Sequence, residues 1–549
     1  MKPFPVAMSL VASYISGVTI LGTPAEIYNF GTQYWFIAFS IWFSGTTVAF
    51  VYLPVFCRLQ VNSSYEYLEM RFNREVRTLA SILFVMDEIM FLPIVIYVPS
   101  LAFNQVTGMD VHVIGSIVCL ICIFYTVLGG LKAVVYTDTW QIIVMFISVI
   151  VIVILGSNAI GGPIVVWHRG SEGGRLIFDN FSSSLYERHT IYGVITGGIV
   201  YWTAFNGVNQ TMVQRYLSLP NEKDSKLSVL MFTVGVSLFI SLCVYSGLLV
   251  YATYHKCDPL SAGRIQQDDQ LLPLYVMETV GHLRGVPGLF IAGVFGAALS
   301  SLSVVLNSTA AVVLEDFVKG CLRIRLTEKT ATFLVKIVIL VLGAISMGFL
   351  FVVERMGGIL AGATSLSAIS AGTTFGVFTL GMLIPWSNSV GAIIGAITGT
   401  TVSSVIAFGS QYSIATGLIV LHKLPISVER CKADYGIQAN VTEIPYPNES
   451  NIFPLFRLSY HWITPIGIIT TVAVGTIFSF IFGKTNISCL DPELITPVCQ
   501  WLLPPEAQRY AGTAARRVRD FTQTEENRGL MQEATSSIMN LRVNPTATR

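Results

Sequence analysis

Residues 295–316 read FGAALSSLSVVLNSTAAVVLED, and this stretch decides how the chain is interpreted. It is apolar enough to lie in a membrane, yet ten of its residues include five hydroxyl side chains and one amide: Ser300, Ser301, Ser303, Asn307, Ser308 and Thr309. Small and hydroxylated residues let neighbouring membrane helices approach and hydrogen-bond. Alternatively, clustered oxygens bind a hard cation. Both explanations remain open from this segment alone.

The helical period places most of these hydroxyls on one face. Ala297, Ser300, Ser301, Val304 and Ser308 fall within one arc of about 100°. Two adjacent serines, together with the carbonyl of a residue one turn earlier, form a compact all-oxygen cluster. The segment therefore predicts a cation site, with contact between helices as the alternative.

The composition indicates a polytopic α-helical membrane protein. Of the 549 residues, 53% are hydrophobic and 12% are charged, against about 25% charged in soluble chains. Mean hydropathy is +0.65. The net charge of +1 does not suggest a nucleic-acid partner. There is no nucleophile–base constellation and no cofactor motif, so we do not expect an enzyme.

Membrane helices need about 20 mostly apolar residues, and about twelve segments qualify. They lie near 4–24, 33–56, 78–103, 111–129, 139–159, 191–207, 227–253, 286–316, 332–353, 359–385, 389–409 and 460–483.

The distribution of Lys and Arg predicts the orientation. Twelve basic residues fall in the connections on one side, at 57–77, 130–138, 208–226 and 317–331. The positive-inside rule makes that side cytoplasmic. The loops 160–190, 254–285 and 410–459 are then extracellular, and both termini are cytoplasmic. We expect a multi-pass protein of the plasma membrane.

The outer loops carry candidate modification sites. The sequons of Asn180, Asn440 and Asn448 lie there, so all three are candidates for glycosylation. Cys257 and Cys431 also lie outside on this map, but the sequence does not show whether they pair.

Residues 9–26, SLVASYISGVTILGTPAE, predict a discontinuous first helix. Ser, Gly and Pro at this density weaken a continuous helix. Unwound backbone at membrane depth is tolerated only beside a cavity or inside protein. Secondary transporters bind solute and ion at such breaks. A kinked but inert helix is the alternative.

Several motifs resemble the sodium/solute symporters, the family of the sodium–glucose, iodide, multivitamin and monocarboxylate cotransporters. The resemblance covers about residues 3–483. It rests on ASYISG, EIYNFGTQYWF, YEYLEMRF, YTVLGGLKAVVYTDTWQ, GVNQTMVQRYLS and AALSSLSVVLNSTAAVVLEDFVK. PAEIYNFGTQYWF and NQTMVQRYLS look most like the multivitamin and monocarboxylate branch, which implies a small organic anion as the substrate.

The resemblance implies a LeuT-type fold of two inverted five-helix repeats. The first repeat would cover 1–159 and the second 191–385, with the extracellular loop 160–190 between them. Accessory helices would follow over 386–483, including the extracellular loop 410–459, and a cytoplasmic tail over 484–549. The family often has a further helix before the first one here, and we expect the fold to hold without it.

The family's sodium site, carried over residue by residue, lies between the first and eighth helices. Its ligands would be the carbonyls of Ala12, Ile15 and Ala297 and the hydroxyls of Ser300 and Ser301. The substrate would lie beside the unwound turn and face the tenth helix. These positions are Ser13, Tyr14, Ser16, Thr19, Thr364, Ser365 and Ser367.

The resemblance leaves a second sodium site open. Family members with a second sodium use two adjacent hydroxyls and a cytoplasmic-side aspartate. Here Ser303 is followed by Val304, and the acid would be Asp138. One hydroxyl of the pair is therefore missing.

Three acidic residues in or next to predicted membrane segments are candidates for a specific role. Asp87 and Glu88 are about ten residues into the third helix, where ionisable groups are rare. They have a role in gating or proton linkage, or else one faces a water-filled crevice and the other a hydroxyl. Glu26, near the outer end of the first helix, is expected to orient a loop.

Together these observations predict a symporter coupled to Na⁺ that imports small organic anions, monocarboxylates or related vitamins, by alternating access in a lipid bilayer. Two alternatives remain at this stage. One is a proton-coupled carrier, motivated by Asp87 and Glu88. The other is a sodium-permeable channel or a non-transporting sensor on the same fold.

Overall fold

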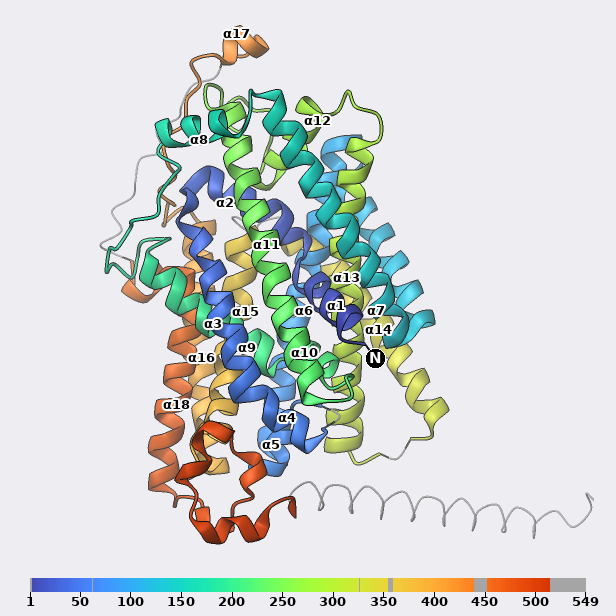
Figure 1. Ribbon diagram of the computed structural model, residues 1–549, viewed down its shortest axis with the longest axis vertical. Coiled ribbons are helices and arrows are strands. Elements are labelled where there is room, and N and C mark those ends of the chain that lie inside the picture. The colour runs from blue at the N-terminus through green and yellow to red at the C-terminus, as the bar shows by residue number, and fades with distance from the viewer. Residues whose placement is uncertain (1, 62, 325, 354–358, 439–451, 514–549) are drawn as a thin grey trace, which may run out of the picture.

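The computed structural model describes residues 2–61, 63–324, 326–353, 359–438 and 452–513 (Figure 1). Every regular element within these ranges is a helix. The helices are α1 (Pro3–Tyr14), α2 (Thr23–Phe30), α3 (Ile37–Thr47), α4 (Leu53–Leu59), α5 (Glu66–Arg71), α6 (Arg74–Thr107), α7 (Val111–Ala159), α8 (Pro163–Glu172), α9 (Gly198–Val208), α10 (Gln210–Tyr216), α11 (Glu222–Tyr254), α12 (Leu271–Thr279), α13 (Val286–Val312), α14 (Glu328–Val353), α15 (Ile359–Leu383), α16 (Ser389–Ala415), α17 (Cys431–Tyr435) and α18 (Ile463–Ile481).

Most predicted membrane segments correspond to long apolar helices. Within the described residues, 10 helices are long and apolar enough to cross a membrane, or 11 when the bent pair Pro3–Tyr14 and Val18–Phe30 counts as one span. The predicted segment 191–207 is helical but short, because its helix breaks at Asn209. The predicted segments 111–129 and 139–159 correspond to the two spans Val111–Gly129 and Val134–Ala159, and the predicted connection at 130–138 is itself helical, as part of α7.

The first span is broken, as its sequence indicates. Residues 15–17 separate α1 from a π-helical turn at Val18–Gly22, and the two halves are bent by 59°. Gly17 lies against α6, where a Cβ atom at its position would come within 2.7 Å of Val98 Cγ1. The small residues of this stretch therefore allow both the bend and the close approach of a neighbouring helix.

The sixth span contains a second break. After α9 ends at Val208, Asn209 is extended (φ −65°, ψ 133°), and α10 begins at Gln210. The Asn209 side chain accepts a hydrogen bond from the Thr211 backbone N–H at 2.8 Å and so caps α10. The first helix of each predicted repeat is thus discontinuous.

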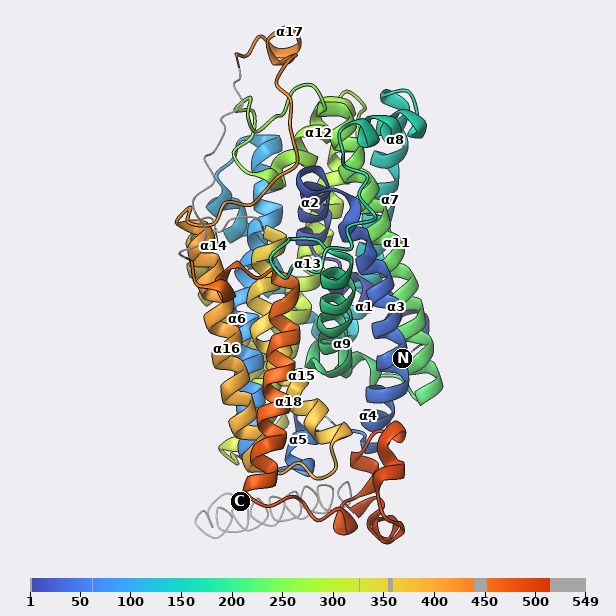
Figure 2. The same ribbon diagram turned by 90° about the vertical axis from the view of Figure 1, so that its left-hand side faces the viewer.

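The two ends of the bundle differ. One end carries α8, α12 and α17, and the opposite end carries α4, α5 and the segment after α18 (Figures 1 and 2). A disulfide joins Cys257 to Cys431 at the α17 end. The loop after α11 and the loop after α16 therefore lie on the same side of the bundle.

Candidate functional site

The break in the first span meets the serines of α13. Ser300 Oγ donates to the carbonyl of Ala12 at 2.7 Å and lies 3.1 Å from the carbonyl of Ala297. Ser301 Oγ donates to the carbonyl of Ser13 at 3.3 Å. Because α1 ends at Tyr14, the carbonyls of Ala12 and Ser13 lie in its last turn, where the helix supplies no further N–H donor.

This arrangement suits a sodium ion. Two hydroxyls and the carbonyls of two helices converge in a fully buried position, since Ala12, Ala297 and Ser300 have no exposed surface. When an ion is present, the hydroxyl oxygens would turn their lone pairs toward it and complete an oxygen shell. Ile15, the remaining predicted ligand, is the buried C-cap residue of α1.

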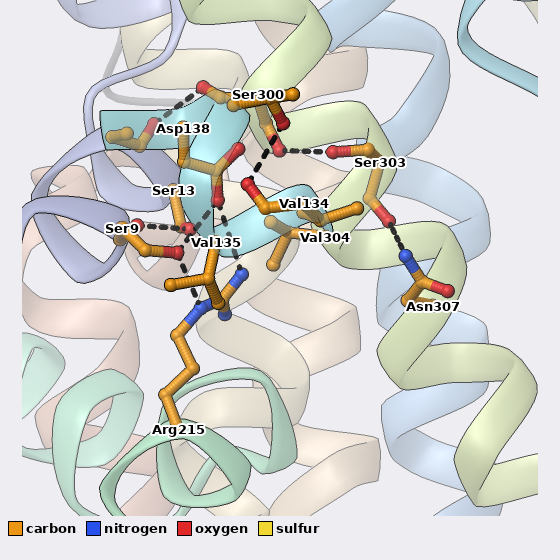
Figure 3. A network of polar contacts seen from close by, with 12 residues as sticks. Ser9, Ser13, Val134, Val135, Asp138, Arg215, Ser300, Ser303, Val304 and Asn307 are labelled. Carbon is orange, nitrogen blue, oxygen red and sulfur yellow. Dashed lines mark hydrogen bonds and ion pairs between the residues drawn. The ribbon is translucent and has the colours of Figure 1, made fainter. Parts of the chain in front are cut away.

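Asp138 lies in a different set of contacts (Figure 3). Its Oδ2 accepts a hydrogen bond from Ser9 Oγ at 2.7 Å and lies 3.7 Å from Arg215 Nη2. Arg215 Nε also donates to Ser9 Oγ at 3.0 Å. Ser303 Oγ donates to the carbonyl of Ser300 at 3.0 Å. Asp138 therefore has a basic partner of its own, and a second sodium at Asp138 and Ser303 stays a prediction.

A cavity lies beside the broken helix. It contains about 1100 Å³ of empty space, part of it open to solvent. Six of the seven predicted substrate residues line it: Ser13, Tyr14, Ser16, Thr19, Thr364 and Ser367. Ser365 does not, because its hydroxyl lies 3.4 Å from Gln411 Nε2 on α16.

The other walls of the cavity are mostly aromatic. Residues absent from the predicted set include Tyr34, Phe91, Tyr201, Trp202, Phe205, Tyr460 and His461. Tyr14 packs on Trp202 with ring centroids 3.9 Å apart. No sequence signal distinguishes these rings from ordinary core residues, because each lies in an apolar segment. Asp87 and Glu88 also face this cavity.

A cluster of charged side chains lies at the α2 end of the cavity. Arg188 Nη2 donates to Glu26 Oε2 at 2.9 Å, and His189 Nε2 lies 2.7 Å from Glu26 Oε1. His189 Nδ1 is 3.3 Å from Nε2 of His461, which lines the cavity. The predicted role of Glu26 as an acid that orients a loop is confirmed, since both partners belong to the loop before α9.

Burial opposes the positive charge of both loop residues, but the net effect on the pKa differs between them. It opposes the charge of Arg188, but the carboxylate of Glu26 outweighs this and raises the Arg188 pKa. Burial lowers the pKa of His189 below its usual value, against the opposing effect of Glu26. The cluster therefore consists of an ion pair and a histidine that favours its neutral form.

Asn180, a candidate glycosylation site, hydrogen-bonds through its side-chain amide within its own loop. Asn180 Nδ2 donates to Glu187 Oε2 at 3.0 Å and to the His189 carbonyl at 2.9 Å. Asn440 and Asn448 lie outside the described residues.

Comparisons with known proteins agree with this geometry. Residues 1–399 match the family model described as the sodium:solute symporter family. The chain belongs to this family. It is 38% identical over 499 residues to the sodium-coupled monocarboxylate transporter 2 of Mus musculus, which covers 90% of this chain and 80% of that protein. It is 36% identical over 511 residues to the sodium-coupled monocarboxylate transporter 1 of Homo sapiens, covering 90% and 83%.

A solved structure confirms the predicted LeuT-type fold. The substrate-bound, outward-open structure of a Na⁺-coupled sialic acid symporter superposes with a TM-score of 0.70 at 21% identity, covering 88% of this chain and 91% of that one. Family membership makes the protein a multi-pass sodium-coupled symporter and not an enzyme. The comparisons support sodium as the coupling ion and do not support the proton-coupled, channel or sensor alternatives.

Proposed function

We propose that this protein imports short monocarboxylates with sodium across the plasma membrane. The observation that carries the proposal is the contact between the α13 serines and the broken first span, next to a cavity lined by both breaks of the bundle. The similarity to sodium-coupled monocarboxylate transporters supports the substrate class. Related vitamins such as biotin or pantothenate are the second candidates.

Sodium would bind between α1 and α13. Its ligands would be the carbonyls of Ala12, Ile15 and Ala297 and the hydroxyls of Ser300 and Ser301. The ion links the two helices electrostatically, so its binding favours the conformation in which they are apposed. This is how the sodium gradient would drive substrate uptake.

The substrate carboxylate would lie at the unwound turn of the first span. Backbone N–H groups at a helix break attract an anion, and Ser13, Ser16 and Thr19 supply neighbouring hydroxyls. The rings of Tyr14, Trp202 and Phe205 would enclose a short apolar chain. Thr364 and Ser367 would complete the site from α15.

Alternating access would move the two repeats, 1–159 and 191–385, around this site. The loops 160–190, 254–285 and 410–459 would face the outside, and the termini would be cytoplasmic. The Cys257–Cys431 disulfide supports this orientation, because disulfides persist in oxidising compartments. Glycans at Asn180, Asn440 and Asn448 would mark the same face.

The test is uptake of a labelled panel of carboxylates by cells that express the chain, with sodium present or replaced by choline. Saturable uptake of lactate- or butyrate-sized anions that requires sodium is the expected result. Uptake confined to biotin or pantothenate would shift the substrate to the vitamins. Absence of sodium-dependent uptake of any monocarboxylate, with protein at the surface, would overturn the proposal.

A further inference from the structure

Asp87 and Glu88 are adjacent acids on α6 that face the interior of the bundle. Glu88 is 4% exposed, and it faces the Asn209 and Thr211 side chains at the second helix break. Asp87 faces Ser367 of α15. Among the described residues, no ion pair joins either carboxyl group to a basic side chain. Within the part of the chain that the structure describes, no lysine or arginine lines the cavity around them.

Two such acids are costly unless something compensates them. A carboxylate removed from water must be paired, protonated or bound to a cation. Glu88 has an amide and a hydroxyl beside it, which stabilise a carboxyl group in either form. Asp87 has one hydroxyl neighbour, and its Oδ1 is buried with no hydrogen-bond partner.

A second, smaller cavity begins at Asp87. It contains about 320 Å³ of empty space, part of it open to solvent, between α6, the α9–α10 break and α15. Oxygen-bearing side chains in its lining are Tyr65, Asp87, Asn209, Ser367, Ser370 and Thr374. The three α15 residues are spaced i, i+3 and i+7, so they share one face of that helix.

Thr374, on this face of α15, has a buried hydroxyl group without a hydrogen-bond partner. Its side chain is 5% exposed, and its Oγ1 has no hydrogen-bond partner. Threonines in helices usually satisfy the hydroxyl on the carbonyl four residues earlier, as Thr364 does with Leu360 at 2.8 Å. Thr374 does not, and it lines the same cavity as Asp87, whose Oδ1 is also unpartnered.

We infer that this cavity is a cation site, separate from the one between α1 and α13, and that it binds sodium. Asp87 supplies the charge, and Ser367, Ser370 and Thr374 supply neutral oxygens. A hard cation takes such an all-oxygen set. A proton on Asp87 would also neutralise its charge. The protonated carboxyl group would donate to one oxygen only, and this would not account for the other side-chain oxygens in the lining of the cavity.

The inference also bears on the proposed substrate, and only this consequence rests on the proposed function. A carboxylate beside Asp87 and Glu88 would meet like charge in a medium of low dielectric constant. A sodium ion on Asp87 removes that repulsion. Cation binding at Asp87 would therefore precede binding of the organic anion.

The experiment measures ²²Na⁺ binding to the purified full-length protein in detergent, without any carboxylate. Asp87→Asn and Thr374→Val should each weaken one class of sodium sites by roughly tenfold or more. The matched control is Thr373→Val, because Thr373 is equally buried on the same helix but its hydroxyl accepts from Thr400 at 3.3 Å. This control should bind sodium as the unmodified protein does.

The other outcomes are informative. Thr374→Ser keeps the hydroxyl and should restore binding, which separates loss of a ligand from misfolding. Unchanged sodium binding in folded Asp87→Asn and Thr374→Val would overturn the inference. The inference would also be overturned if Asp87→Asn changed only the pH dependence of sodium binding, since Asp87 would then carry a proton. The binding assay contains no carboxylate. Its result therefore stands even if the protein proves not to transport monocarboxylates.

Discussion

Two acids at opposite ends of the cavity, Glu26 and Asp87, are compensated in different ways. Glu26 on α2 has Arg188 within 2.9 Å and His189 within 2.7 Å. Asp87 on α6 lies beside the Ser367 hydroxyl, has an unpartnered Oδ1, and forms no ion pair with a basic side chain among the described residues. The chain supplies the counter-charge for Glu26, but Asp87 needs one from solution. An acid thus serves loop attachment at one end of the cavity and, on our inference, ion binding at the other.

The largest effect that tests this comparison is expected for Arg188→Ala. Removal of one partner of a buried ion pair costs about 3–5 kcal/mol, because the other charge is left uncompensated. Surface biotinylation and thermal unfolding of the purified protein should show a strong loss. Arg284→Ala, at an exposed position, is the control.

The double variant Arg188→Ala/Glu26→Gln sharpens the same test. It removes both charges, so it should recover part of the stability lost in Arg188→Ala. Equal destabilisation of the single and the double variant would contradict the view that the ion pair is what holds the loop to α2.

The next effect concerns the proposed sodium site between α1 and α13, whose proposed ligands carry no charge. Ser301→Ala removes a buried oxygen ligand, worth about 1.5–3 kcal/mol when it contacts a charge. Sodium-dependent uptake should therefore need roughly ten- to hundredfold more sodium. Ser346→Ala is the control, since its buried hydroxyl bonds only to the Leu342 carbonyl of its own helix. An unchanged sodium dependence would instead favour the serines as contacts between helices.

A smaller effect is expected from pH. Burial lowers the pKa of His189. Protonation of His189 therefore favours states in which it is exposed to solvent and has left its contacts with Glu26, Arg188 and His461. Stability is present above the usual histidine pKa of about 6.5 and is lost as pH falls through the lowered value. The expected loss is on the order of 1 kcal/mol.

Thermal unfolding of the purified protein at a series of pH values checks this. His189→Gln should remove most of the loss of stability at acid pH. His168→Gln, at a position whose side chain is 72% exposed, should leave it intact. A pH profile that His189→Gln does not change would assign the acid sensitivity to another group.

The smallest effect on stability is expected for Asp87→Asn. The substitution replaces a carboxyl group that lacks a basic partner with a neutral amide, so the protein should reach the surface in unchanged or greater amount. Glu26→Gln, which leaves Arg188 without its counter-charge, should reduce the surface amount. Equal losses in the two variants would break the comparison between the two acids.

Much of the fold followed from local chemistry. The runs of apolar residues predicted eleven of the spans, and the Ser–Gly–Pro content of 9–26 predicted the break in the first one. The arc of serines on one helix face predicted a polar cluster, and the family resemblance placed that cluster beside the break. These features depend on the hydrophobic periodicity, the length and the residue types of a single segment, and all three can be read from the sequence.

The partners of buried polar groups were decided only by the tertiary structure. Glu26 meets Arg188, and Asp138 meets Arg215, across sequence separations of 162 and 77 residues that no periodicity encodes. The break at Asn209 interrupts a segment whose composition is ordinary. Asp87 and Thr374 are 287 positions apart, and only the packing of α15 against α6 places both residues in the lining of one cavity. The sequence by itself determined which residues enter the membrane, because burial in lipid depends on each segment alone; which charges neutralise one another depended on how the segments pack.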